Sequence, residues 1–148
     1  MSEHVASITW KRVGEGFDVQ SYSRDHRWRF DNGIEVSASA APAYRGNPAC
    51  VDPESAFVAS ISSCHMLTFL AICARRHIVV NGYTDRAIGH LERGPNGKFA
   101  MTRVELRPKI EFEGTAPAAE ELHALHEQSH ADCFIASSVT TAITVAEE

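Results

Sequence analysis

The sequence predicts an α+β fold in which antiparallel sheets pack around one long, buried helix, and three observations indicate it. Residues 5–40 and 78–113 are rich in alternating, β-forming segments that end in Gly, Pro and Asn turns. Residues 52–76 begin with a strong helix-start signal and continue into an apolar run. Residues 117–145 contain a second helical pattern and a last strand. Because strands and helices are segregated along the chain, the class is α+β.

Length and composition limit the possible functions. A chain of 148 residues that is 44% hydrophobic predicts a single globular domain over residues 1–148. The formal net charge of −5, with scattered basic residues, argues against a nucleic-acid or anionic-membrane surface. We find neither a signal peptide nor an apolar run of membrane-spanning length, so we expect a cytoplasmic protein. Its four cysteines then indicate free thiols, a metal site or redox chemistry.

The first forty residues predict four strands, over 5–10, 17–22, 24–30 and 34–40. The first two of these are separated by the Gly14-Glu15-Gly16 turn, and Asp31-Asn32-Gly33 supplies the positive-φ residues of a tight hairpin turn between the last two. Alternation along 24–30 places Arg24 on the apolar face. An arginine brought into a core must meet an anion, so Arg24 is a candidate functional residue.

The first helix begins at an unambiguous signal. Asp52 is the predicted N-cap, Pro53 occupies the first helical position, and Glu54 lies beside the positive end of the helix dipole. The helix should run to about Arg76. Its second half, residues 66–74, is apolar nearly all the way round, which is typical of a helix covered on every side. One domain with few other helices can hardly supply that cover, so we expect the helix to pack against its twin in a homodimer.

The rest of the chain completes the predicted fold. A long β-hairpin should join 78–93 to 98–113 through the turn at residues 94–97. A second helix is expected over about 117–130, then a helical turn over 131–137 and a strand over 139–145.

The four cysteines differ in their surroundings. Cys64 lies about three turns into the first helix among several serines, which suggests a lined pocket, and its thiol is either inert filling or a protected reactive centre. Cys73 lies roughly 13 Å further along the axis on the opposite face, so it cannot bond to Cys64 and is a core residue. Cys50 is in a loop and incidental. Cys133, beyond the second helix, could approach Cys64 only through the tertiary fold.

A reactive Cys64 needs a nearby cation, because burial alone raises a thiol pKa. His65 projects about 100° away around the helix and is interpreted as structural or interfacial. Arg24 is the better cation, with Glu54 as its anion or support; an ordinary buried ion pair explains these two residues equally well. Glu54 precedes Cys64 by roughly 15 Å of helix rise, so if both serve one site they come from different subunits.

Three histidines on the second helix raise the question of a metal. His123, His126 and His130 share one helical face, and Cys133 follows one turn on, so a zinc ion could use the set. Paired C-x-x-C spacing is absent, and histidines on an amphipathic helix are more often polar-face or core-edge residues. We therefore expect no metal and no other cofactor.

Two stretches carry a family resemblance: Asp52-Pro53-Glu54 leading to Ser63-Cys64-His65-Met66-Leu67, and Leu125-His126 leading through His130 to Cys133-Phe134-Ile135-Ala136. In these stretches and in the order of its elements, nearly the whole chain resembles the OsmC/Ohr family of organic hydroperoxide reductases, small thiol peroxidases of bacteria. Two departures suggest an OsmC-like side branch. Phe134 stands where many members have proline, and the Gly-Arg context of the arginine in the Ohr branch is absent.

The resemblance implies both an architecture and a mechanism. The architecture is an intertwined homodimer with two sites at its interface. Cys64 would be the peroxidatic cysteine, Cys133 the resolving cysteine, and Glu54 the carboxylate that positions an arginine, here Arg24. Cys64 would attack an organic or fatty-acid hydroperoxide and become a sulfenic acid, and Cys133 would close a disulfide that an external dithiol, by family analogy a lipoylated protein, reduces.

Two other functions remain open from the residues. One is a non-catalytic thiol redox sensor or a hydrophobic small-molecule binding protein that uses the same buried pocket. The other is a metal-dependent protein that uses the helix histidines.

Overall fold

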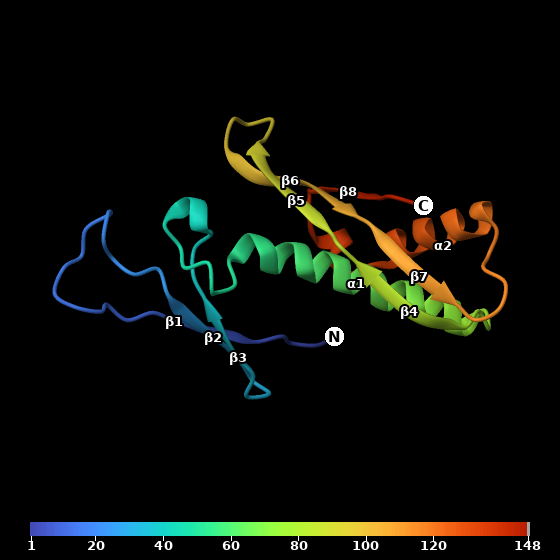
Figure 1. Ribbon diagram of the computed structural model, residues 1–148, viewed down its shortest axis with the longest axis horizontal. Helices are drawn as coiled ribbons and strands as arrows, with labels where there is room; N and C mark the ends of the chain where they lie inside the picture. Colours follow the sequence, from blue (N-terminus) through green and yellow to red (C-terminus); the bar gives the residue numbers. More distant parts are fainter. Residues whose placement is uncertain (148) are drawn as a thin grey trace. The chain divides into compact units, whose positions relative to one another are not determined.

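The computed structural model describes residues 1–147 and divides into two compact units, Met1–Ala56 and Phe57–Glu148 (Figure 1). The predicted α+β class with antiparallel sheets and a long helix is confirmed. The single domain over 1–148 stays a prediction.

The first unit is built on a three-stranded antiparallel sheet of β1 (Ala6–Thr9), β2 (His26–Phe30) and β3 (Glu35–Ala38). The predicted β2–β3 hairpin is confirmed, with Trp28 opposite Val36. In its turn only Gly33 has a positive φ, 86°, because Gly33 N–H bonds back to the Phe30 carbonyl at 2.9 Å. After β3, a short 3-10 helix, η1 (Pro42–Tyr44), lies in the loop before the first α-helix.

The strand expected over residues 17–22 is wrong, because this segment is a turn. The Asp18 carbonyl accepts the N–H groups of Ser21 and Tyr22, each at 3.1 Å, and the Asp18 carboxylate accepts the N–H of Gln20 at 3.0 Å. Aspartate bonds of this kind offer the backbone a local alternative to a strand ladder.

The second unit contains two sheets and two helices. Helix α1 (Pro53–Arg75) begins in the first unit and continues through the second. The remaining elements are β4 (Val80–Asp85), β5 (Ile88–Arg93), β6 (Phe99–Leu106), β7 (Pro108–Phe112), α2 (Ala119–Asp132), the 3-10 turn η2 (Ala136–Ser138) and β8 (Ala142–Val145).

The long hairpin over 78–113 is confirmed, but it divides between two sheets. Strands β5 and β6 pair across the Gly94–Gly97 turn, while β4 pairs with β7 in a separate sheet. Strand β8 joins β6 in parallel, with Val104 opposite Ile143. The pairing is parallel because the chain returns to β6 through the crossover that contains α2.

The N-cap of α1 is confirmed, since Asp52 Oδ1 accepts the Ser55 N–H at 2.8 Å. The helix then buries one stripe, made of Ile61, His65, Phe69, Ile72 and Cys73. Within the second unit its other side is open, and 60% of Leu67 is exposed. Full cover of the apolar half is therefore not supplied by the second unit alone.

By length and mean hydropathy, α1 could cross a membrane, contrary to our expectation that no segment has this character. The core helix of a globular fold has the same character, so the observation is weak evidence for a membrane span.

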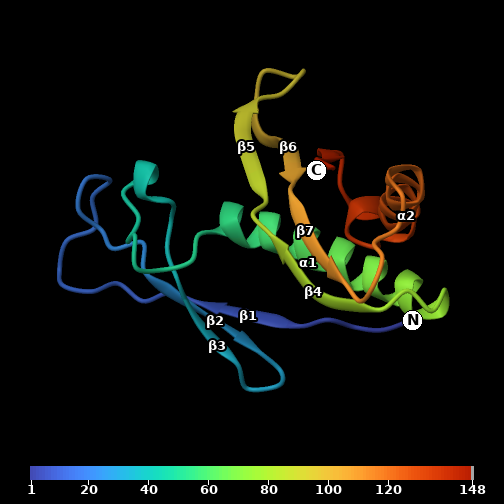
Figure 2. The same cartoon turned by 45° about the vertical axis from the view of Figure 1, so that its right-hand side comes forward.

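Two apolar clusters hold α1 in the second unit. Phe69 and Cys73 of its second half pack with Leu125 of α2 against β4 and β7, whereas Ile61 packs against Val104 of β6. The cluster around Phe69 includes the thiol of Cys73, which confirms that Cys73 is a core residue. Figure 2 shows β4 and β7 passing alongside α1. It also shows α2 beside the second half of α1. The two clusters fix α1 between both sheets and α2.

Candidate functional site

The second unit brings two thiols together. Cys64 lies half-buried on α1, and Cys133, only 1% exposed, caps the C-terminal end of α2. The two thiols lie close enough to interact. Burial first, and then the interaction with the Cys64 thiol, raises the pKa of Cys133. Of the four cysteines, Cys64 and Cys133 are thus held side by side in one chain, without a disulfide.

The turn after α2 fixes the Cys133 sulfur. The Ala136 N–H donates to Cys133 Sγ at 3.4 Å, and the Cys133 carbonyl accepts the N–H and the hydroxyl of Ser137, each at 3.1 Å. This is the helical turn expected over residues 131–137, which the structure places slightly later as η2. Because these bonds come from its own segment, Cys133 is held by α2 and η2 together.

Two of the serines near Cys64 have hydrogen-bond partners away from the thiol. The Ser60 hydroxyl donates to the Phe57 carbonyl at 2.7 Å, and the Ser62 hydroxyl donates to the Asp85 carboxylate of β4. The other Asp85 oxygen accepts the Arg107 N–H at 2.7 Å. Ser62 therefore links α1 to β4 and, through Asp85, to the junction between β6 and β7, a role that the sequence did not indicate.

A buried histidine pair lies beside the thiols. His65 Nε2 and His126 Nδ1 are 3.0 Å apart, and the two rings stack at 5.3 Å between centroids. The His126 ring also stacks on Phe69 at 4.7 Å. Each histidine is 2% exposed, and burial lowers the pKa of His65 to about 4 and also lowers the pKa of His126. Both rings are therefore neutral at physiological pH, and His65 is structural, as expected.

The three histidines of α2 do not converge on a metal site. His126 is buried against α1, whereas His123 and His130 are exposed, and His123 Nδ1 lies 2.7 Å from Glu147 Oε1. Over residues 1–147, no group of three or more His, Cys, Asp or Glu side chains could hold a metal ion. Sequence spacing grouped these three histidines and missed the His65–His126 pair. The spacing of His65 with Ile61 and Phe69, which places all three on one buried stripe of α1, could have indicated that His65 is buried.

The two other predicted site residues belong to the first unit. The Arg24 guanidinium donates to the carbonyl oxygens of Tyr22 and Val19 and lies 3.7 Å from the centroid of the Tyr22 ring. Arg24 also lines an apolar pocket of about 440 Å³ together with Trp10, Phe17 and other side chains of this unit. The thiol pair belongs to the second unit, so the structure does not determine the distance between Arg24 and the two thiols.

Glu54 lies in the first turn of α1, and its Oε2 is buried. Within the described chain this oxygen has no hydrogen-bond partner. A buried carboxylate oxygen without a partner is unusual in native structures and calls for a donor from elsewhere.

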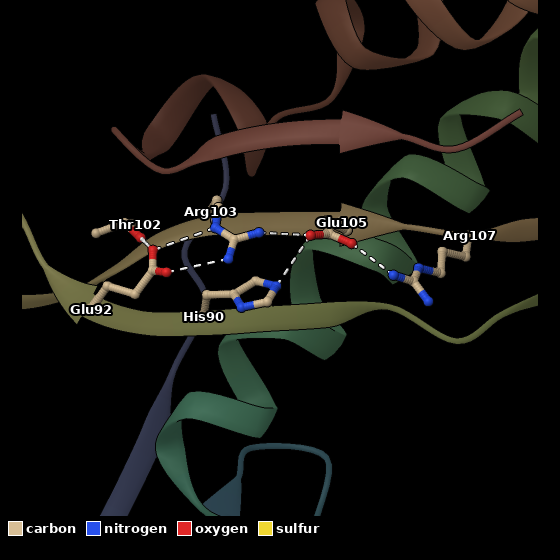
Figure 3. A network of polar contacts seen from close by, with 6 residues as sticks. All are labelled: His90, Glu92, Thr102, Arg103, Glu105 and Arg107. Atoms are coloured by element: carbon tan, nitrogen blue, oxygen red, sulfur yellow. Dashed lines mark hydrogen bonds and ion pairs between the residues drawn. The ribbon is translucent and has the colours of Figure 1, made fainter.

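A network of charged side chains covers one face of β5 and β6 (Figure 3). Glu105 accepts from Arg103 at 2.7 Å and from Arg107 at 2.8 Å, and its Oε1 lies 3.2 Å from His90 Nε2. The Arg107 bond is the main reason that the pKa of Glu105 is lowered. These side chains are solvent-exposed or half-buried, so the network is typical of a solvated sheet face.

We expect the buried histidine pair to make stability depend on pH. A folded-state pKa of about 4 for His65, against an ordinary 6.5, corresponds to about 3 kcal/mol of folding free energy near neutral pH. Because the unfolded state binds the proton first, this contribution is complete above about pH 6.5 and is lost as the pH falls toward 4. Urea unfolding between pH 7.5 and 4.5, at constant protein concentration, measures it.

The control for this prediction is a variant that lacks both imidazoles but keeps the ring stack, His65→Phe/His126→Phe. Its unfolding free energy should vary much less over the same pH range. An exposed control, His123→Gln, should keep the acid loss of the wild type. An equal slope in the double variant would contradict the assignment of this pH dependence to the buried pair.

The family follows from a direct match. The OsmC family model, described as OsmC-like protein, matches residues 46–148, which is more than half of the chain. The chain belongs to the OsmC-like family. The resemblance expected from the two cysteine stretches is confirmed at the level of the family.

Solved structures of other OsmC-like proteins share the fold. An OsmC-like protein of unknown function from Vibrio cholerae is 47% identical, with a TM-score of 0.93 and 99% of each chain covered. An organic hydroperoxide resistance protein from Elizabethkingia anophelis is 21% identical, with a TM-score of 0.75, covering 100% of this chain and 98% of that one. The organic hydroperoxide resistance protein OhrB of Bacillus subtilis is 15% identical, with a TM-score of 0.68, covering 97% and 98%. Among curated proteins, the sequence has no match.

Proposed function

We propose that this OsmC-like protein is a cysteine-based peroxidase that reduces organic hydroperoxides to alcohols. The observation that carries the proposal is that the Cys64 and Cys133 thiols lie close enough to interact, although 69 positions separate them in the sequence. A binding protein has no need of a second thiol at this position. The names of the Elizabethkingia and Bacillus relatives, organic hydroperoxide resistance proteins, support the same substrate class.

The proposed reaction uses both sulfurs in turn. The Cys64 thiolate attacks the distal peroxide oxygen, the O–O bond breaks, and the alkoxide leaves and takes a proton to become the alcohol. Cys64 is then a sulfenic acid. The Cys133 sulfur attacks the Cys64 sulfur, hydroxide leaves as water, and a disulfide forms. An external dithiol, of the lipoylated-protein class, reduces this disulfide by exchange and restores both thiols.

The two sulfurs suit these separate roles. Cys133 is fully buried with a raised pKa, so it stays a thiol at neutral pH and does not compete for the peroxide. Cys64 is only half-buried and can meet a substrate. The proposal therefore assigns the first attack to Cys64 and the closing step to Cys133.

Arg24 and Glu54 complete the proposed site across a homodimer. Arg24 stabilises the Cys64 thiolate and the leaving alkoxide, and Glu54 orients its guanidinium. The partnerless Glu54 Oε2 and the open apolar side of α1 both support a second copy of the chain. The second copy would supply a hydrogen-bond donor to Glu54 and would cover the apolar side of α1. Dithiol recycling suits a reducing compartment, so we place the activity in the cytoplasm.

The test is a hydroperoxide consumption assay with a dihydrolipoamide recycling system. We expect faster turnover of cumene hydroperoxide or a lipid hydroperoxide than of hydrogen peroxide, because an apolar substrate gains binding energy from the apolar pocket that Arg24 lines. Mass spectrometry of the oxidised protein should show one Cys64–Cys133 disulfide. Disulfide formation without turnover of any hydroperoxide would instead indicate a thiol sensor, and the absence of both would contradict the proposal.

A further inference from the structure

Two polar contacts connect α1 to the α2 segment in the second unit. One joins Cys64 to Cys133, and the other joins His65 to His126. On α1 the two contacts come from consecutive residues. In the α2 segment the same two contacts come from His126 and Cys133, which are seven residues apart. Seven residues are nearly two helical turns, so His126 and Cys133 share one face of α2. The histidine contact is therefore a fixed point for the element that carries Cys133.

The other contacts between α1 and α2 hold the two helices together but define the rotation of α2 about its axis less sharply. Phe69, Leu122 and Leu125 form an apolar contact, which is not directional. A hydrogen bond from Arg76, directly after α1, to Gln128 of α2 measures 2.6 Å, but this bond is exposed to solvent. The His65–His126 bond is buried, directional and held between stacked rings.

The thiol pair is sensitive to small rotations of α2. Side chains extend about 5–6 Å from a helix axis, so a rotation of about 20° would move Cys133 Sγ by about 2 Å. That distance is about the length of an S–S bond. A buried bond that fixes the rotation of α2 is thus able to decide whether the two sulfurs meet.

We propose that the His65–His126 hydrogen bond positions Cys133 for disulfide closure with Cys64. The two histidines are positioning residues and touch neither the substrate nor the reacting sulfurs in this role. One neutral ring donates its N–H and the other accepts, so the bond has a single geometry. The inference rests on the proposed function, because closure requires that Cys64 is first oxidised by a hydroperoxide to its sulfenic acid.

The first experiment separates the two chemical steps in the full-length protein. One equivalent of cumene hydroperoxide is added, and samples are quenched at short times with a sulfenic-acid trap and a thiol alkylator before intact-mass analysis. His65→Phe/His126→Phe removes the hydrogen bond, keeps an aromatic stack on Phe69 and leaves no imidazole without a partner. His126→Asn keeps a polar atom near the Nδ1 position, and His123→Phe changes an exposed histidine of the same helix.

In the double variant, we expect sulfenic-acid formation at Cys64 to stay within about twofold of the wild-type rate, because its reacting groups are unchanged. Disulfide closure should slow by at least about tenfold, since small misplacements of reacting atoms are costly. His126→Asn should recover much of the closure rate, and His123→Phe should match the wild type. Equal slowing of both steps, or no recovery in His126→Asn, would overturn the positioning role. If the double variant does not fold, the single variant His126→Phe tests the proposal, through the ratio of its disulfide-closure rate to its sulfenic-acid formation rate.

The second experiment measures closure without any hydroperoxide, by exchange with mixtures of oxidised and reduced dithiothreitol. The folded double variant should form the Cys64–Cys133 disulfide at least about tenfold less readily than the wild type. If the wild type forms no such disulfide, the proposed peroxidase fails. If the wild type closes and the double variant closes equally well, the peroxidase proposal survives and the positioning role is wrong.

Discussion

Replacing Cys64 by serine is expected to lower kcat/KM for organic hydroperoxides by at least about 1000-fold, because a hydroxyl at its ordinary pKa cannot replace the thiolate nucleophile. Cys133→Ser should behave differently. Its first oxidation at Cys64 should proceed at nearly the wild-type rate, but the sulfenic acid should accumulate and turnover should stop. Stopped-flow consumption of one equivalent of cumene hydroperoxide, followed by steady-state assay, distinguishes these results.

The matched control for these thiol variants is Cys50→Ser, since Cys50 is half-buried in the first unit and belongs to the loop after η1. It should keep both the single-turnover and the steady-state rates. Peptide mapping after oxidation should find Cys133 joined to Cys64. A dominant disulfide from Cys50 to Cys64, with full activity in Cys133→Ser, would overturn the assignment of Cys133 as the resolving thiol.

A mixture of two inactive variants is expected to regain activity if the site is shared between subunits. Glu54→Gln removes the carboxylate and Cys64→Ser the nucleophile, so each homodimer should be inactive. Along α1 the two residues are roughly 15 Å apart, too far for both to reach one reacting centre from the same helix. After joint unfolding and refolding, a heterodimer would contain one site with Cys64 from one chain and Glu54 from the other. Peroxidase activity should return in part.

The control for the mixing experiment is native mass spectrometry, which should find heterodimers with twice the 16.2 kDa chain mass. Mixing Cys64→Ser with the double variant Glu54→Gln/Cys64→Ser should restore nothing. Heterodimers without activity would show that Glu54 does not act across the interface. A folded monomer at micromolar concentration would remove the shared site altogether.

The elements with strong local signals could be predicted from the sequence. The Asp52 N-cap and Pro53 set the start of α1 within the chain, and the Gly94–Gly97 turn set the β5–β6 hairpin. The strand expected over 17–22 failed because Asp18 accepts four short-range hydrogen bonds that alternation does not reveal. Local patterns decide the structure only where no competing local hydrogen bond exists.

The parts of the site that depend on distant residues could not be obtained from spacing. His65 and His126 are 61 positions apart, and their contact depends on how α2 packs against α1. The nearness of Cys64 to Cys133 was expected only from the family resemblance, for the same reason. The sequence analysis left His65 as structural or interfacial, and it could not identify the ring that His65 contacts.

The parallel pairing of β8 with β6 has a consequence for how the protein folds. Ala142 pairs with Arg103 across a large separation in sequence, and Cys133 lies in the intervening segment. Closing so long a loop is entropically costly, and contacts of high sequence separation form slowly. During synthesis, β8 leaves the ribosome after α2 and η2, so β6 gains this neighbour only after the intervening segment has been made. The segment with Cys133 is therefore anchored at both ends only after β8 has paired, and the two thiols reach their final positions late in folding.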